Sequence, residues 1–262
     1  MRRWIKALVI LFGLIVLYQM VGSFFFIISM IFYGDIESIP GNVNVIGLIF
    51  TQLFMLGFVF LIFKDQHVKT YVRFIPIKRH MVFWSFVGGV AILPISTLLI
   101  QAMHYIMPSV VDNYIELMDQ SLGGANLVIT LISVAILAPL VEEVIMRGVL
   151  FRQLETATMR PIVIVLLSGL IFGVFHMNIV QGVFTTVAGI IFAVGFLWTR
   201  SLWVPIIMHL ANNLFAVLIG EIPLNIVESS PFTIVFFVLM LGLPLSLWMI
   251  YKQSRYLSSS ER

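Results

Sequence analysis

The chain of 262 residues contains no cysteine. It can therefore form no disulfide, no thiolate metal site and no cysteine nucleophile, and it has no cysteine that could carry a lipid anchor. Charge is scarce too, because Asp, Glu, Lys and Arg together make up only 10% of the residues. A typical soluble domain has about 25% of such residues, so the composition argues against a water-soluble protein.

Hydrophobic residues make up 61% of the chain, and the mean hydropathy is +1.10. A membrane-spanning helix needs about 20 predominantly apolar residues. Uncharged runs cover residues 7–34, 38–63, 81–111, 120–141, 161–199, 201–220 and 229–251. The run 161–199 is long enough for two helices, with Asn178, Gln181 and Gly182 as the turn. The sequence predicts an all-α polytopic membrane protein, a bundle of about eight transmembrane helices forming a single transmembrane domain over residues 1–262.

The loops indicate how the bundle is oriented. All 15 Lys and Arg residues fall on one side of the eight-helix arrangement. The charged residues of the opposite loops are all acidic, namely Asp35, Glu37, Asp112, Glu116, Asp119, Glu221 and Glu228. Because basic loops stay in the cytoplasm, we expect both termini to face the cytoplasm of a bacterial-type plasma membrane. The first run lacks a small-residue cleavage site and is predicted to be a retained span. The basic loops also explain the pI near 9.3, so no nucleic-acid partner is expected.

Glu142, Glu143 and Arg147 form the densest polar cluster within the predicted spans. An ionisable residue in a membrane helix costs roughly 2.5 to 3.5 kcal/mol on insertion scales, so such a cluster indicates a functional site. Glu143 and Arg147 are four residues apart and can pair, whereas Glu142 lies about 100° further around the helix, unpaired. Pro139 removes a backbone hydrogen bond near the two acids. The alternative to a functional site is a structural Glu–Arg pair at the cytoplasmic end of a helix, whose side chains extend into the membrane–water interface.

Two further clusters follow along the chain. His176 ends the segment Phe172-Gly173-Val174-Phe175-His176, and by itself it could be an interfacial histidine bonded to a carbonyl. His209 and Asn213 are four residues apart on the seventh predicted span, so they share one helix face. Their alternative role is an interhelical hydrogen-bonding pair, which contributes about 0.6 kcal/mol.

The hairpin between the fourth and fifth spans decides whether these clusters can meet. If its turn is centred near Thr158 and Met159, Glu142 and His176 each lie about 17 residues away, or roughly 25 Å along their helices. The two side chains would then be level in the membrane. This requires the fourth helix to continue past Arg147 to about residue 156. Gly169 and Gly173 would let the fifth helix approach a neighbour closely.

Three motifs in this order, Glu-Glu-x-x-x-Arg, Phe-x-x-x-His and His-x-x-x-Asn, resemble those of the CPBP family of intramembrane proteases. This family is also called the CAAX protease and Abi family, and it includes the Ras-converting CAAX endopeptidases. The resemblance implies a CPBP-like catalytic core over residues 125–219. It also implies an intramembrane endopeptidase that hydrolyses a peptide bond of a membrane-associated, prenylated or bacteriocin-like peptide or protein. Its expected partners are membrane lipid and that substrate.

The resemblance also implies roles for the motif residues. Glu142 would be the general base that activates a water, with His176 sharing the proton or orienting the water. His209 and Asn213 would stabilise the oxyanion, and Glu143 and Arg147 would hold the first acid in place. This mechanism requires no cofactor.

A zinc mechanism would use three of the same residues as ligands. Glu142, His176 and His209 supply a carboxylate and two imidazoles, with an open position for water. The His-Glu-x-x-His signature of the usual zinc proteases is missing from the chain. The sequence leaves both mechanisms open, and it leaves the oligomeric state open as well.

Two other function classes compete with a peptidase. One is a non-catalytic immunity or regulatory membrane protein that retains the protease fold. The other is a secondary transporter with a proton-carrying carboxylate, although no inverted repeat of broken helices supports it. The isolated polar residues Gln19, Gln52, Gln101 and His104 are predicted to form interhelical hydrogen bonds.

Overall fold

The computed structural model describes residues 3–35, 38–64, 68–157 and 159–260. Arg2, Glu37, Thr158 and Arg262, which entered the loop and turn predictions, lie outside these ranges. All regular structure in the described part is helical. The elements outside the fourth span are α1 (Arg3–Tyr33), α2 (Gly41–Ile62), α3 (Val68–Tyr71), α4 (Arg79–Ile106), α5 (Pro108–Leu122), α9 (Pro161–Phe175), α10 (Ile179–Thr199), α11 (Trp203–Gly220), α12 (Leu224–Val227), α13 (Ser230–Val238), η4 (Leu239–Leu241) and α14 (Gly242–Ser260).

Seven helical stretches in the described part are long and apolar enough to cross a membrane. They are Phe12–Tyr33, Gly41–Ile62, Arg79–Ile106, Leu127–Thr156, Ile179–Thr199, Trp203–Gly220 and Ser230–Arg255. The predicted all-α polytopic membrane fold is therefore confirmed. The expected count of eight full spans needs correction, because the fifth helix, α9, has only 15 residues. At 1.5 Å per residue it is about 22 Å long, against a hydrocarbon core of about 30 Å.

The chain turns between α9 and α10 earlier than predicted. Met177 adopts a left-handed conformation with φ of 53°, and the Asn178 side chain caps α10 by accepting from the backbone N–H groups of Val180 and Gln181. Asn178 was correctly placed in the turn. Gln181 and Gly182, predicted to belong to it, lie within α10 instead.

The fourth span is one continuous helix over Leu127–Thr156 that changes its winding twice. Its parts are α6 (Leu127–Thr130), the π-helical η2 (Leu131–Leu137), α7 (Ala138–Glu143), the π-helical η3 (Val144–Phe151) and α8 (Arg152–Thr156). The helix thus runs past Arg147 to residue 156, as the level arrangement of Glu142 and His176 requires. Arg152 anchors its polar end by donating to the Tyr71 carbonyl at 2.6 Å.

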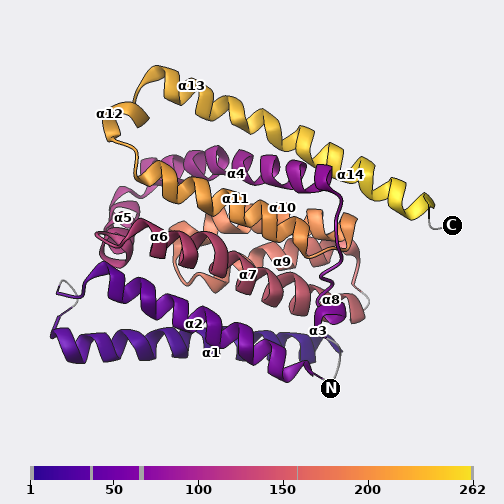
Figure 1. Cartoon of the computed structure of the whole chain (residues 1–262), viewed down its shortest axis with the longest axis horizontal. Helices are drawn as coiled ribbons and strands as arrows, with labels where there is room; N and C mark the ends of the chain where they lie inside the picture. Colours follow the sequence, from indigo (N-terminus) through magenta and orange to yellow (C-terminus); the bar gives the residue numbers. More distant parts are fainter. Residues whose placement is uncertain (1–2, 36–37, 65–67, 158, 261–262) are drawn as a thin grey trace.

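The helices run side by side, with α1 and α2 along one edge and α13 and α14 along the opposite edge (Figure 1). Both termini lie at the same end as α3 and α8, whereas α5, α12 and the link between α1 and α2 lie at the other end (Figure 1). Arg200 lies at the same end as the termini, because it pairs with Glu155 of α8. The basic segments are therefore gathered at one end, as their sequence positions predicted.

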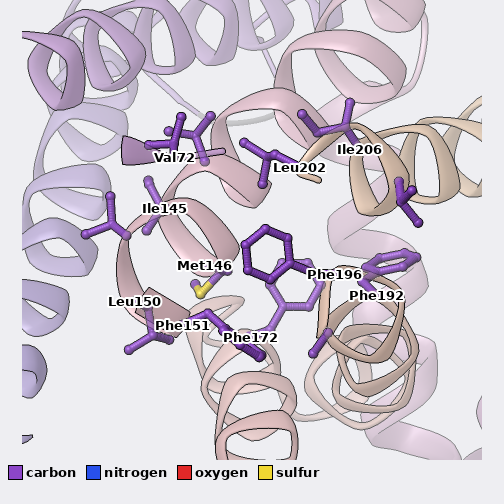
Figure 2. Packing of buried hydrophobic residues seen from close by; sticks show 14 of the residues in the cluster. Val72, Ile145, Met146, Leu150, Phe151, Phe172, Phe192, Phe196, Leu202 and Ile206 are labelled. Carbon is purple, nitrogen blue, oxygen red and sulfur yellow. The ribbon is translucent and has the colours of Figure 1, made fainter. Parts of the chain in front are cut away.

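Apolar side chains from η3, α9, α10 and α11 interlock at the centre of the bundle (Figure 2). Phe151 and Phe196 meet edge to face at 5.2 Å. The helices α9 and α10 approach closely because glycines lie between them. A methyl group at Gly169 would meet the Thr186 carbonyl oxygen at 2.9 Å, and one at Gly173 would collide with the Gly182 carbonyl oxygen. The predicted close approach of the fifth helix is confirmed.

The isolated polar residues divide into two groups. Gln19 on α1 donates to the Phe175 carbonyl at 3.2 Å, and Gln52 on α2 accepts from Ser133 at 3.3 Å, so both form the predicted interhelical bonds. His104 on α4 also forms an interhelical bond, to Asp112 on α5 at 3.1 Å, but at an exposed position. The interhelical hydrogen bond predicted for Gln101 was wrong, because this residue is exposed rather than packed between helices.

Candidate functional site

Glu143 on α7 lies at the centre of the site and is fully buried. Its Oε1 accepts hydrogen bonds from Arg147 Nη1 at 3.0 Å and from His209 Nδ1 at 3.1 Å. The predicted ion pair between Glu143 and Arg147 is present, because four residues separate the two along the helix. The contact with His209 joins the first motif to the third across 66 positions of sequence.

Arg147 on η3 is also fully buried, which is costly for a cation unless its donors are satisfied. Besides Glu143, its Nη2 donates to the Gly189 carbonyl on α10 at 2.6 Å. Its guanidinium carbon lies 5.0 Å from the Phe172 ring centroid and 5.7 Å from that of Phe192. A carboxylate, a carbonyl and two aromatic rings replace part of the water that the guanidinium loses, while its Nε has no hydrogen-bond partner among the described residues.

Glu142 is the acid that the sequence left unpaired, and it is 7% exposed. Its Oε2 lies 3.9 Å from His209 Nε2, too far for a direct hydrogen bond. The same Oε2 is buried and has no hydrogen-bond partner. A buried carboxylate oxygen without a partner is costly, so this atom marks a place where a polar ligand or water would be stabilised.

His209 on α11 lies between the two acids. A carboxylate can only accept hydrogen bonds, so the contact with Glu143 requires a proton on His209 Nδ1. The other nitrogen, Nε2, then faces Glu142. The imidazole stacks on Phe192 with centroids 4.9 Å apart, and the Phe172 ring meets it edge-on at 5.6 Å.

His176 caps the end of α9 and is half-buried. Its Nδ1 lies 2.8 Å from the Phe172 carbonyl oxygen, and its ring packs edge-on against the Phe172 ring at 4.9 Å. It lies near enough to His209 to interact with it electrostatically. Between the described side chains of His176 and Glu142 there is no direct hydrogen bond, so the structure brings His176 to the site through His209 and Phe172.

Asn213 lies one turn beyond His209 on the same face of α11. Its Nδ2 donates to the Val134 carbonyl on η2 at 2.9 Å, and its Oδ1 accepts from Asn212 at 3.2 Å. One N–H of the Asn213 amide is therefore engaged, which leaves its second N–H for another acceptor.

The structure also differs from the predicted support for Glu142. Glu143 and Arg147 were expected to hold the first acid in place, but Glu143 instead accepts a hydrogen bond from His209. Glu142 instead has Tyr18 of α1 within electrostatic range, and Gln52 of α2 lies near the Tyr18 hydroxyl. Neither residue was assigned to the site from sequence, because no local spacing links α1 and α2 to the fourth span.

Phe192 is a further residue that sequence reasoning missed, since it was grouped with the packing aromatics. The zinc set of Glu142, His176 and His209 does not assemble in the described part of the chain, where no three His, Asp or Glu side chains gather closely enough to hold a metal ion. The arrangement therefore does not fit the zinc alternative, and no step below passes through a metal.

Comparison with known proteins agrees with the motifs. Residues 124–215, which contain all seven motif residues, match the family model described as type II CAAX prenyl endopeptidase Rce1-like. The putative membrane peptidase YdiL of Bacillus subtilis is 33% identical over 91 residues, which cover 35% of this chain and 37% of that protein. The membrane-embedded CAAX protease MroQ of Staphylococcus aureus is 34% identical over 90 residues, which cover 32% of this chain and 36% of that protein.

The matched segment spans little more than a third of the length of these curated relatives. No solved structure gives a significant match. The match and the site coincide, because the segment holds α7, η3, α9, α10 and most of α11. Over residues 124–215, about a third of its length, the chain is similar to the type II CAAX prenyl endopeptidases of the Rce1-like family.

Proposed function

We propose that this protein is an intramembrane endopeptidase that hydrolyses a peptide bond of a membrane-associated peptide or protein with a water activated at Glu142. The observation that carries the proposal is the pair of facing atoms Glu142 Oε2 and His209 Nε2, 3.9 Å apart and buried. A separation of this size can be bridged by one water that bonds to both atoms. The partnerless Oε2 supplies the acceptor for the proton of that water.

The charges of the site support a cationic His209 during the reaction. Glu142 and Glu143 are two buried carboxylates, and Arg147 supplies one positive charge. With a second proton on His209, two negative charges face two positive ones, so the buried set is neutral. Because Glu142 must be ionised to accept a proton, we propose this state for the reaction, in which no buried charge is left uncompensated.

The reaction can be written with the side chains present. Glu142 removes a proton from the water, whose oxygen attacks the peptide carbonyl carbon. The carbonyl oxygen becomes an oxyanion, which accepts hydrogen bonds from His209 Nε2 and from the second N–H of Asn213. Glu142 then delivers its proton to the leaving amine as the C–N bond breaks. His176 orients the water beside His209.

The substrate and the setting are proposed from the family. The matched family model is that of CAAX prenyl endopeptidases, and one relative is named a CAAX protease. We therefore propose a membrane-anchored peptide substrate, prenylated or bacteriocin-like, in a bacterial-type plasma membrane. The basic end of the bundle would face the cytoplasm together with both termini.

The test is cleavage of a membrane-anchored peptide by the purified protein in liposomes. Glu142→Gln keeps the size of the side chain but removes the base, so we expect the rate to fall about a thousand-fold or more while the protein remains folded. Glu116→Gln on the exposed surface of α5 is the matched control and should retain the parent rate. Cleavage at the parent rate by Glu142→Gln would rule out the proposed base.

The same variants separate an enzyme from a non-catalytic immunity or regulatory protein. A cellular phenotype that survives Glu142→Gln does not depend on peptide hydrolysis. A phenotype that is lost in Glu142→Gln and kept in Glu116→Gln supports the peptidase.

A further inference from the structure

Phe192 on α10 contacts two polar residues of the site although it belongs to none of the three motifs. Its side chain is 1% exposed. Its ring stacks on the His209 imidazole with an interplanar angle of 23°, which is close to parallel. The Arg147 guanidinium lies on the same ring at 5.7 Å.

The surroundings of His209 show why this stacking matters. The imidazole has one hydrogen bond, from Nδ1 to Glu143. This hydrogen bond restrains the two side-chain torsions of His209 only partly, so the plane of the ring also depends on the side chains packed against it. Phe192 covers one face of the ring and Phe172 meets it edge-on, with an interplanar angle of 86°. The two phenyl rings thus restrict the imidazole to a single orientation of its plane.

That plane determines which acid the second nitrogen faces. With Nδ1 on Glu143, His209 Nε2 lies 3.9 Å from Glu142 Oε2. A tilt of the ring would move Nε2 away from the position of the proposed water. Displacements of about 1 Å in a catalytic group can cost about a hundred-fold in rate.

We infer that Phe192 is a positioning residue of the proposed reaction, whose ring holds the His209 imidazole in the plane that directs Nε2 toward Glu142. This inference rests on the proposed function and extends it to a residue outside the family motifs. Figure 2 shows the Phe192 ring among the aromatic side chains between α9, α10 and η3.

Phe196 provides a matched control from the same helix. It lies four residues further along α10 and is equally buried, at 1% exposed. Its ring packs against Phe151 at 5.2 Å and lies 5.8 Å from the Arg73 guanidinium. Replacement of either phenylalanine by leucine removes a similar amount of core packing, but only Phe192 touches His209.

The first experiment compares Phe192→Leu and Phe196→Leu in liposomes with a membrane-anchored peptide. For Phe192→Leu we expect kcat to fall about ten-fold, the equivalent of about 1.4 kcal/mol, with KM unchanged. Phe196→Leu should keep the parent kcat. Equal loss of kcat in both variants would overturn the inference and assign Phe192 to packing alone. If Phe192→Leu does not fold, Phe192→Met fills the space with a flexible chain that lacks a ring.

The second measurement does not depend on turnover. In the parent protein with ¹⁵N-labelled histidine, the NMR signals of His209, assigned by their loss in His209→Gln, should show one state with a protonated Nδ1. Phe192→Leu should broaden or split these signals, and Phe196→Leu should leave them unchanged. Unchanged His209 signals in Phe192→Leu would overturn the inference. A parent protein without peptidase activity would refute the proposed function, whereas these spectra would still decide the role of Phe192.

Discussion

Arg147 is a fully buried arginine whose guanidinium donates to Glu143 and to the Gly189 carbonyl between two aromatic rings. These contacts join η3 to α9 and α10. Removal of one partner of a buried ion pair leaves the other charge uncompensated, which costs about 3–5 kcal/mol. Arg147 therefore matters for the stability of the fold as well as for the site.

Substitution of Arg147 by methionine should lower the free energy of unfolding in detergent by about 3–5 kcal/mol. The double variant Glu143→Leu with Arg147→Met should recover part of this loss, because neither buried charge remains. Lys252→Met, at an exposed position on α14, is the control and should change the free energy by less than about 1 kcal/mol. If Arg147→Met and Lys252→Met changed the free energy of unfolding equally, the assigned role of Arg147 would be contradicted.

At the residue scale, the sequence predicts contacts that depend on local spacing. The pair of Glu143 and Arg147 follows from a separation of four residues on one helix. The bond from His209 to Glu143 spans 66 residues and depends on how α11 packs against α7, which spacing does not reveal. The stacking of Phe192 on His209 was missed for the same reason, since a phenylalanine in a membrane helix is ordinarily a packing residue.

Helices α9 and α10 approach each other closely near the site, and glycine makes this approach feasible. A methyl group at Gly173 would collide with the Thr186 hydroxyl and with the Gly182 carbonyl oxygen, and the latter is backbone that cannot move aside easily. The α9 helix ends two residues later at Phe175, and His176 follows directly. Any separation of α9 from α10 would therefore displace His176 as well.

Gly173→Ala should lower the free energy of unfolding by about 1–3 kcal/mol, because the added methyl group overpacks the interface. The control is Gly57→Ala in α2, where a methyl group would meet nothing within 4 Å and alanine favours the helix. Thermal unfolding of both variants in detergent checks the comparison. A Gly173→Ala protein as stable as Gly57→Ala would show that the helices separate without cost.

The helix α1 brings Tyr18 to the site from outside the segment that matches the family. Its ring packs edge-on against Phe175 at 5.0 Å, next to His176, and its hydroxyl lies near Gln52 and within electrostatic range of Glu142. Tyr18→Phe keeps the ring but removes the hydroxyl. We expect peptidase activity to fall about three- to ten-fold with little change in unfolding temperature.

The control for this substitution is Tyr105→Phe, because the Tyr105 side chain is 92% exposed. It should leave the rate of peptide cleavage unchanged. A Tyr18→Phe protein with the parent rate would limit the role of α1 to packing against α9.

At the element scale, hydrophobic runs predict where helices lie but not how they are wound. The π-helical segments on both sides of α7 and the early end of α9 were not predicted. Hydrophobicity is similar in α- and π-helical turns, so it cannot distinguish them. The early end of α9 depends on the left-handed Met177 and on the Asn178 cap, and the residues 161–199 give no charge to mark it.

The whole molecule gathers its basic segments at one end, which the positive-inside rule assigns to the cytoplasm. The sequence predicted this grouping because it depends only on the order of spans and loops. The short α9 did not disturb it, since the chain still reverses direction between α9 and α10. The side on which each end lies can be measured directly in a chain without native cysteine.

Single cysteines at exposed loop positions should report the orientation. A membrane-impermeant thiol reagent added to intact cells should label Glu221→Cys but not Lys69→Cys, and permeabilised cells should label both. Both side chains are exposed at opposite ends of the bundle. Labelling of Lys69→Cys in intact cells would invert the proposed topology and place the termini outside.

Hydrolysis consumes water, and a bilayer interior contains almost none. The helix α9 is about 8 Å shorter than the hydrocarbon core is thick. Lipids beside a helix that is too short thin locally, so the aqueous phase comes nearest to the protein where α9 ends, at His176. We therefore expect the short α9 to bring water closer to His176 than a helix of full length would.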